Sequence, residues 1–195
     1  DEDKQRGIMY SQQRERKTLE DSSNNLEDFL KNMDLKITIK KADSFTIPRI
    51  SQLILKTNQF NLTTKRYSFE EIQTMSTDPN FLMGCVQVED KFGDNGITAA
   101  FIVEKNNSKE WVIDTFLLSC RVMGRQIEKS ILSYIIKIAK ENNVPKIFTN
   151  FIPTKKNQPI ENFLPDCGFK KEKDYWFISL IDSFKGPDFI KIEEK

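Results

Sequence analysis

The sequence predicts an α/β protein of the α+β type, in which a central sheet is flanked by helices. The main observation is segment 111–141, where an apolar strand passes through a glycine-containing loop into an amphipathic helix. Residues 111–119 are almost all apolar, as in a strand covered on both faces. Beyond residue 125 the apolar positions recur at helical spacing. Two further strands, 81–88 and 97–104, are predicted to form an antiparallel pair in the same sheet.

Composition narrows the class of protein. The 195 residues fit one domain with an appendage, and 38% hydrophobic residues can fill a core. Thirty basic and 29 acidic side chains nearly cancel, so we expect neither a nucleic-acid partner nor a membrane surface. The chain has no histidine, and its three cysteines are widely spaced. We therefore expect no metal site, reduced thiols and a cytoplasmic location.

Residues 1–33 are predicted to be a helical linker segment. The first 20 residues are highly charged and contain few apolar side chains, so a helix there can bury little by itself. Asn24, with Glu27 three residues later, predicts the start of a second, short helix. Because the chain begins on this charged segment without methionine, we expect a fragment of a longer protein. The main domain, 34–182, then begins with the alternating strand 35–40.

Helices, strands and turns then follow in order. Thr46 before Pro48 predicts a helix over 47–56, and Ser68 with Glu71 predicts a capping box. The other expected elements are a helix from the capping box to residue 76, a loop at 89–96, a strand at 146–151, a loop at 152–158, a short helix at 159–164, a turn at 167–169, a closing strand at 175–181 and a frayed tail at 183–195.

This element order resembles that of the GNAT acyltransferase fold, in which a mixed, mostly antiparallel sheet is flanked by helices. The motifs that add to the resemblance are LKITI (35–39), KTNQFNLTTKRYS (56–68), VEDKFGDNGI (88–97), IDTFLLSCRVMGR (113–125) and FIPTKKNQPIENF (151–163) with CGF (167–169). They resemble the C-terminal GNAT-like domain of FkbH-like proteins, also called HAD-superfamily phosphatase subfamily IIIC, over roughly 35–180. Segment 2–20 is similar to the stretch that follows the HAD domain in such proteins.

The resemblance implies an acyltransferase domain of a bifunctional protein. Such a domain transfers a glyceryl or related acyl group to the phosphopantetheine thiol of an acyl carrier protein. The implied cofactor is carrier-bound phosphopantetheine or coenzyme A, and the implied partners are the carrier and a HAD phosphatase domain of the same full-length chain. Two alternatives stay open. One is a non-catalytic module that docks the carrier or its pantetheine arm, and the other is an N-acetyltransferase that uses acetyl coenzyme A.

The loop 121–126 is the candidate phosphate site. It would present backbone N–H groups at a helix N-terminus, where the helix dipole and two arginines favour an anion. Arg121 and Gly124 match the GNAT pyrophosphate pattern (Q/R)xxGx(G/A), with Arg125 at its variable position, but Gln126 departs from the pattern at its last position. The loop residues predicted to bind the cofactor are Arg121, Val122, Met123, Gly124, Arg125 and Gln126. An ordinary strand-to-helix loop is the alternative.

Cys120 and Asp114 are the candidate catalytic residues. Cys120 ends the central strand beside Arg121 and a helix N-terminus, an environment that favours a reactive thiolate, although burial in the core is the common fate of cysteine. Without histidine, any base must be a carboxylate, lysine, tyrosine or water. Six residues of strand span roughly 20 Å, too far for Asp114 to deprotonate Cys120 directly. We therefore also weigh Asp114 as a structural carboxylate bonded to a neighbouring loop.

Two polar loops are candidates for binding the substrate and the pantetheine arm. The predicted residues are Asn58, Gln59, Asn61, Thr63 and Thr64 in the first loop, and Thr154, Lys155 and Asn157 in the second. The resemblance puts the second loop where the sheet splays open to admit the arm, whose amides Thr154 and Asn157 would bind. The alternatives are helix caps for the first loop and a solvated surface for the second.

Overall fold

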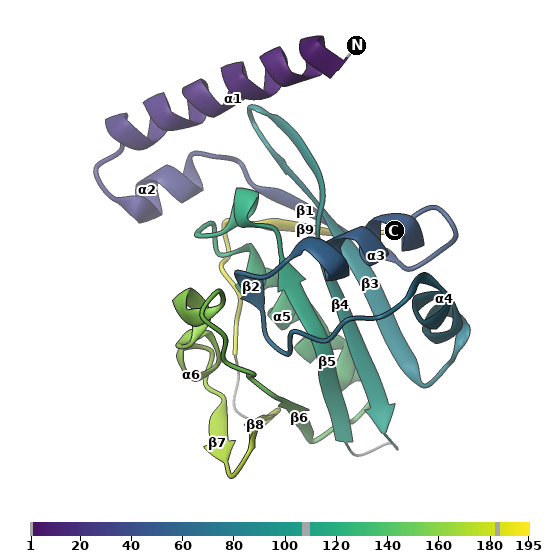
Figure 1. Cartoon of the computed structure of the whole chain (residues 1–195). Helices are drawn as coiled ribbons and strands as arrows, with labels where there is room; N and C mark the ends of the chain where they lie inside the picture. Colours follow the sequence, from purple (N-terminus) through teal and green to yellow (C-terminus); the bar gives the residue numbers. More distant parts are fainter. Residues whose placement is uncertain (1, 107–109, 182–183) are drawn as a thin grey trace.

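The computed structural model describes residues 2–106, 110–181 and 184–195, with backbone alone for residues 2–6 (Figure 1). The strands are β1 (Lys36–Lys41), β2 (Phe60–Asn61), β3 (Phe81–Asp90), β4 (Gly93–Asn106), β5 (Glu110–Leu118), β6 (Lys146–Thr149), β7 (Lys170–Glu172), β8 (Tyr175–Ser179) and β9 (Lys191–Glu194). Within the described residues they form one sheet in the order β7-β8-β6-β5-β4-β3-β1-β9, and β2 pairs with β5. The pairs β5–β6 and β1–β9 are parallel and the other pairs are antiparallel, which confirms the predicted mixed, mostly antiparallel sheet.

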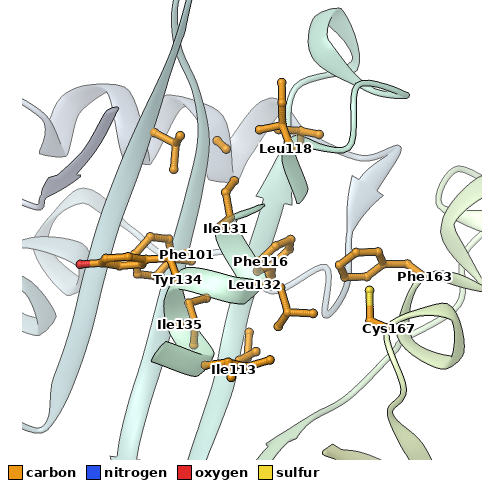
Figure 2. Packing of buried hydrophobic residues seen from close by; sticks show 14 of the residues in the cluster. Phe101, Ile113, Phe116, Leu118, Ile131, Leu132, Tyr134, Ile135, Phe163 and Cys167 are labelled. Atoms are coloured by element: carbon orange, nitrogen blue, oxygen red, sulfur yellow. The ribbon is translucent and has the colours of Figure 1, made fainter. Parts of the chain in front are cut away.

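Helices cover both faces of this sheet. They are α1 (Glu2–Ser22), α2 (Leu26–Lys31), α3 (Ile47–Lys56), α4 (Phe69–Thr77), α5 (Ile127–Glu141) and α6 (Phe163–Asp166). The larger core lies between the sheet and α5, where Phe101, Phe116 and Ile131 are almost fully buried (Figure 2). A smaller core on the other face joins α3 and α4 to β3 and β4. The central strand β5 is therefore covered on both faces, as its apolar run predicted.

Local sequence signals explain several of these boundaries. The predicted capping box is confirmed, because the Ser68 hydroxyl accepts a bond from the Glu71 N–H and the Glu71 carboxylate accepts one from the Ser68 N–H. α3 spans the predicted residues, with Pro48 in its first turn. α2 begins one residue later than predicted, because Asn25 and not Asn24 caps it by accepting from the Asp28 N–H.

Two predictions about irregular segments are wrong. The predicted loop 89–96 is mostly strand, because β3 runs to Asp90 and β4 starts at Gly93. The Asp90 carboxylate accepts bonds from the Phe92 and Gly93 N–H groups, which stabilises a tight turn. The tail is not frayed over 191–194, where β9 adds to the edge of the sheet in parallel with β1. Local sequence patterns do not predict this pairing, because β1 and β9 lie near opposite ends of the chain.

The segment before the predicted boundary contributes to the core. Leu30 and Met33 are fully buried in the larger core, and the side chain of Leu19 packs against it. Burying one such side chain stabilises a fold by about 1.5–3 kcal/mol. The boundary at residue 34 stays a prediction, and a chain cut there would lose these contacts.

Candidate functional site

A cleft of about 1210 Å³ opens beside the C-terminal end of β5. It lies between α3, the segment after α3, the turn after β5 and the loop around the 3-10 turn η2 (Gln158–Ile160). The lining residues are Arg49, Gln52, Leu53, Lys56, Thr57, Asn58, Gln59, Ser119, Cys120, Arg121, Lys155, Lys156, Gln158, Pro159, Glu161 and Asn162. Three stretches that are distant in sequence, 49–59, 119–121 and 155–162, therefore meet around the predicted nucleophile.

The cleft carries an excess of positive charge. Its described lining has the cationic side chains of Arg49, Lys56, Arg121, Lys155 and Lys156, and Glu161 is the acidic residue among them. Burial lowers the pKa of the Arg49 guanidinium, and the charge of Arg121 lowers it further. Two guanidinium groups therefore face a common space. An anion bound there would relieve their repulsion.

Cys120 is exposed in this cleft, whereas Cys85 and Cys167 are buried. β5 ends at Leu118, the Ser119 N–H donates to the Thr98 carbonyl at 2.7 Å, and a 3-10 turn, η1 (Cys120–Val122), then leaves the sheet. Burial raises the pKa of Cys85 to about 11 and that of Cys167, which lies beside Phe163 in Figure 2, to about 12. The alternative that Cys120 is a core residue is therefore wrong, and it is the accessible thiol of the three.

The loop 121–126 divides between the cleft and the interior. Arg121 lines the cleft, whereas Val122 is fully buried and Met123 packs against the core. Arg125 is also buried, and its guanidinium donates to the Asp90 carboxylate at 3.1 Å and to the Arg121 carbonyl at 3.2 Å. Of the predicted cofactor-binding loop residues, the described cleft lining thus contains Arg121.

The backbone of this loop turns at two left-handed residues, Gly124 at φ 78° and Gln126 at φ 60°. The second is the position at which the sequence departs from the GNAT pattern. A non-glycine residue in this region costs roughly 1–2 kcal/mol. Gln126 is also the residue before the first turn of α5, so the strain sits at the helix start.

Asp114 is buried away from the cleft lining. The register of β4 and β5 shifts at this residue, so Asp114 is the extra residue of a β-bulge. Its carboxylate accepts bonds from the Tyr67 hydroxyl at 2.8 Å and the Thr115 hydroxyl at 3.0 Å, and it pairs with the Lys65 ammonium. Burial, and then the bond to Asp114, raise the pKa of Tyr67. These bonds match the interpretation of Asp114 as a structural carboxylate bonded to a neighbouring segment.

The sheet does splay beside β5, but another part of the chain occupies the opening. β6 pairs with β5 along residues 110–113, and β2 pairs with β5 farther on, at Leu117 and Leu118. The Leu62 N–H then donates to the Phe116 carbonyl, and its carbonyl accepts from the Ile152 N–H. Segment 60–62 thus lies where the resemblance put a pantetheine arm.

Asn157 holds this segment in place. Its side-chain amide is buried and donates to the Asn61 carbonyl at 3.0 Å and the Ile152 carbonyl at 2.9 Å, while its oxygen accepts from the Thr154 N–H at 2.7 Å. Asn157 therefore satisfies the chain's own backbone rather than lining the cleft. A buried amide of this kind is costly to leave without its partners.

The other predicted substrate residues separate in the same way. Asn58, Gln59 and Lys155 line the cleft. Asn61 and Thr63 are buried, and the Thr63 hydroxyl donates to the Asp114 carbonyl at 2.7 Å. Thr64 donates its N–H to the Asn61 side chain, and Thr154 donates its hydroxyl to Asn157. In the first loop, Asn58 and Gln59 thus line the cleft, whereas Asn61, Thr63 and Thr64 bond to other parts of the chain.

Sequence reasoning missed the contribution of α3 to the cleft. Arg49, Gln52 and Lys56 recur at helical spacing, opposite the apolar face that includes Ile50 and Ile54. A polar face of a helix usually faces solvent, so its composition alone pointed to nothing more. The sequence did show two cations, Arg49 and Lys56, on one polar face of α3. They indicate a binding site only once the structure places Arg121 in the same cleft.

Among the described residues, no group of three or more His, Cys, Asp or Glu side chains is arranged to hold a metal ion. None of their helices combines the length and the apolar character needed to cross a membrane.

The fold of this chain is similar to those of solved structures whose sequences differ widely from it. No family model matches the chain, and no curated protein matches it. The ribosomal-protein-S18-alanine N-acetyltransferase from Escherichia coli superposes with a TM-score of 0.58 at 11% identity, over 78% of this chain and 97% of that one. Spermidine N-acetyltransferase from Vibrio cholerae, in complex with CoA and spermine, gives 0.57 at 14% identity, over 74% and 96%. Ard1 from Thermoplasma volcanium gives 0.57 at 12% identity, over 75% and 99%.

Proposed function

We propose that this chain, which has the fold of the GNAT acyltransferases, is an acyltransferase that exchanges an acyl group between thiols in the cleft around Cys120. The observation that carries the proposal is the exposed Cys120 thiol in a cleft rich in cationic side chains. A thiol is a strong nucleophile toward acyl carbonyls. The spermidine N-acetyltransferase of similar fold, solved in complex with CoA, supports a thioester as the acyl donor.

The cationic lining suits a donor that carries phosphate. Coenzyme A and carrier-bound phosphopantetheine both carry phosphate and end in a thiol. Arg49, Arg121, Lys155 and Lys156 would hold such a phosphate through charge-assisted hydrogen bonds, each contributing about 1.5–3 kcal/mol. Because segment 60–62 fills the opening between β5 and β6, we propose that the arm enters through the cleft instead.

The proposed reaction is a thioester exchange. The Cys120 sulfur attacks the acyl carbonyl carbon, a new carbon–sulfur bond forms, and the bond to the donor sulfur breaks. The donor leaves as a thiol after taking up the proton that Cys120 releases. The second exchange, onto an acceptor thiol, reverses these steps and restores Cys120. The cationic side chains of the lining stabilise the negative charge that develops on the carbonyl oxygen.

The finer part of the proposal concerns the substrate. We propose a glyceryl or related three-carbon acyl group, and the phosphopantetheine thiol of an acyl carrier protein as the acceptor. The support is the resemblance of the longer motifs, among them FNLTTKRYS and DTFLLSCRVMGR, to FkbH-like proteins. The proposed source of the acyl group is a HAD phosphatase domain in the same full-length chain.

The test is to detect an acyl group on Cys120. The protein would be mixed with a three-carbon acyl thioester of coenzyme A or of holo-carrier protein, and the adduct would be measured by intact and peptide mass spectrometry. We expect one acyl group on Cys120 and none in Cys120→Ser. Cys85→Ser is the matched control and should still be acylated. An adduct that persists in Cys120→Ser would contradict covalent transfer through this thiol.

The alternative that the domain only docks a carrier is favoured by one observation, that segment 60–62 occupies the opening beside β5. A docking module would bind holo-carrier protein in calorimetry with the wild-type affinity in Cys120→Ser. It would also form no acyl adduct and would not accelerate transfer. Transfer that continues at the wild-type rate in Cys120→Ser would instead indicate direct passage between the two external thiols.

A further inference from the structure

We infer that Arg16 of α1 is a positioning residue for the turn that carries Cys120 and Arg121, and that it acts through Asp90 and Arg125. The inference deepens the proposed function, because the turn matters most if Cys120 reacts. α1 contributes no residue to the described lining of the cleft, so Arg16 acts on the turn from outside the cleft. Its basis is a continuous series of contacts from α1 to the end of β5.

The first contact is between α1 and the tip of the β3–β4 hairpin, which lies close to the helix in Figure 1. A Cβ atom on Gly93 would come within 2.2 Å of the Gln12 side-chain nitrogen, so the helix lies directly on the turn. The Arg16 guanidinium also lies 5.9 Å from the centre of the Phe92 ring. The hairpin tip is therefore a docking point for α1.

The second contact is a buried ionic cluster. Arg16 donates to the Asp90 carboxylate from Nε at 2.8 Å and from Nη2 at 3.0 Å, and Arg125 donates from Nη1 at 3.1 Å. The exposed fractions of the side chains are 8% for Arg16, 0% for Asp90 and 11% for Arg125. In such a site the two arginines share one carboxylate, and each limits where the other can sit.

The third contact reaches the cleft. The Nη2 group of Arg125 donates to the Arg121 carbonyl at 3.2 Å, within the turn η1 that also contains Cys120. Both Cys120 and Arg121 line the cleft. Arg125 thus joins the buried cluster to the backbone of the proposed site. Because Arg16 pairs with both oxygens of Asp90, Arg125 makes a single bond to this carboxylate, and its other nitrogen bonds to the Arg121 carbonyl.

Loss of Arg16 should therefore change the conformation of the turn that carries Cys120. Without Arg16, the Asp90 carboxylate would keep its bonds from Phe92, Gly93 and Asn95, but Arg125 would be its one remaining charged partner within the described residues. Arg125 would therefore shift toward the carboxylate positions that Arg16 leaves. The Arg121 carbonyl would then lose its donor, and the turn would relax. Substitutions along connected networks of this kind change coupling by roughly 0.5–2 kcal/mol, which corresponds to about 2- to 30-fold in a rate or affinity.

The experiment compares Arg16→Ala with Arg14→Ala, an exposed arginine of the same helix. The readouts are the alkylation rate of Cys120 by iodoacetamide and the affinity for coenzyme A by calorimetry, both well below the melting temperature. We expect Arg16→Ala to change the alkylation rate and to weaken coenzyme A binding, each about 2-fold or more. Arg14→Ala should match the wild type in both. A lower melting temperature for Arg16→Ala with wild-type values in both readouts would overturn the inference.

A second variant covers the case in which Arg16→Ala does not fold. Arg16→Lys keeps the charge but loses the two-pronged geometry, so it should shift both readouts in the same direction by a smaller factor. No shift in Arg16→Lys would then overturn the inference. If the wild-type protein binds no coenzyme A, the proposed function is weakened, but the alkylation rates still decide the role of Arg16.

Discussion

Arg121 and Arg125 lie in one loop, four residues apart, yet they belong to two regions that differ in how far their positive charge is compensated. Arg125 enters the Asp90 cluster, where two arginines meet a carboxylate that also accepts from Phe92, Gly93 and Asn95. Arg121 enters the cleft, where several cations accompany one glutamate. In the first region the chain's own groups bond to the carboxylate, whereas the described lining of the second has one carboxylate, that of Glu161, among five cationic side chains. Charge compensation, rather than residue type, separates a structural arginine from one that can bind a ligand.

The largest effect that we expect is from removing the centre of the Asp90 cluster. Asp90→Ala would leave Arg16 and Arg125 buried without a counter-charge, which should lower the free energy of unfolding by about 3–5 kcal/mol. Asp174→Ala, at an exposed aspartate, should change it by less than about 0.5 kcal/mol. Urea denaturation monitored by circular dichroism measures both. A decrease in the free energy of unfolding of less than about 0.5 kcal/mol for Asp90→Ala would mean that the cluster does not stabilise the fold.

The same aspartate gives a pH dependence. Burial alone would raise the pKa of Asp90, but the bonds and charge of Arg16, with the bonds from Asn95 and Phe92, hold it below its ordinary value. Its contribution is therefore complete above the unfolded pKa of about 3.9 and is lost as the pH falls through the lower folded pKa. The difference in unfolding free energy between wild type and Asp90→Asn should be constant from pH 7 to about 5 and shrink below about 4. A difference that grows on acidification would contradict this assignment.

The next effect is a crossed pattern between the two arginines. Arg121→Ala should weaken coenzyme A binding about 10-fold or more, from the loss of a charge-assisted bond, and leave stability within about 0.5 kcal/mol. Arg125→Ala should lower the free energy of unfolding by about 2 kcal/mol or more, because Asp90 loses a buried partner. Calorimetric titration and urea denaturation of both variants test the pattern. If the two variants behave alike, the division of the loop into two regions is wrong.

The relative reactivity of the three cysteines tests whether the cleft is accessible to solvent. Iodoacetamide should label Cys120 first in the native protein at pH 8, because Cys85 and Cys167 are buried and burial raises their pKa values to about 11 and about 12. Peptide mass spectrometry over time ranks the three, and urea-unfolded protein is the control in which all three should react. Native labelling of Cys167 ahead of Cys120 would argue against the exposure of the cleft thiol.

The smallest effect concerns Glu128, a half-buried residue that contrasts with the fully buried carboxylate of Asp90. Its Oε2 atom is buried without a hydrogen-bond partner among the described residues, and burial raises its pKa. The ionised form therefore destabilises the fold increasingly as the pH rises from the unfolded pKa of about 4.3 through the folded value. Glu128→Gln should raise the free energy of unfolding by about 1 kcal/mol at pH 7, and the gain should vanish below about pH 4. Destabilisation at pH 7 would indicate that the first turn of α5 needs the negative charge.

Sequence reasoning was most successful where the deciding interactions are local. The helical spacing of apolar residues predicted α3 and α5, and Ser68 with Glu71 predicted the start of α4. Such signals involve residues three or four apart, which contact each other whatever the rest of the chain does. The position of Cys120 between the apolar strand and the basic loop made it a candidate nucleophile, with burial in the core as the alternative that its exposure excludes. Fold class and proposed nucleophile were therefore available from the sequence.

What only the tertiary structure decided depends on pairs far apart in the chain. Arg16 and Asp90 are 74 residues apart, and Asp90 and Arg125 are 35 apart, so no local pattern marks Arg125 as structural. Asn157 reaches 96 residues back to Asn61, and β9 pairs with β1 from the opposite end of the chain. A guanidinium or an amide bonds to whichever group folding brings next to it. Once both are buried, breaking that bond to bind a ligand would leave a buried polar or charged group without a partner, which costs free energy. The sequence determined which groups exist, and the packing of distant segments determined which of them remained available in the cleft.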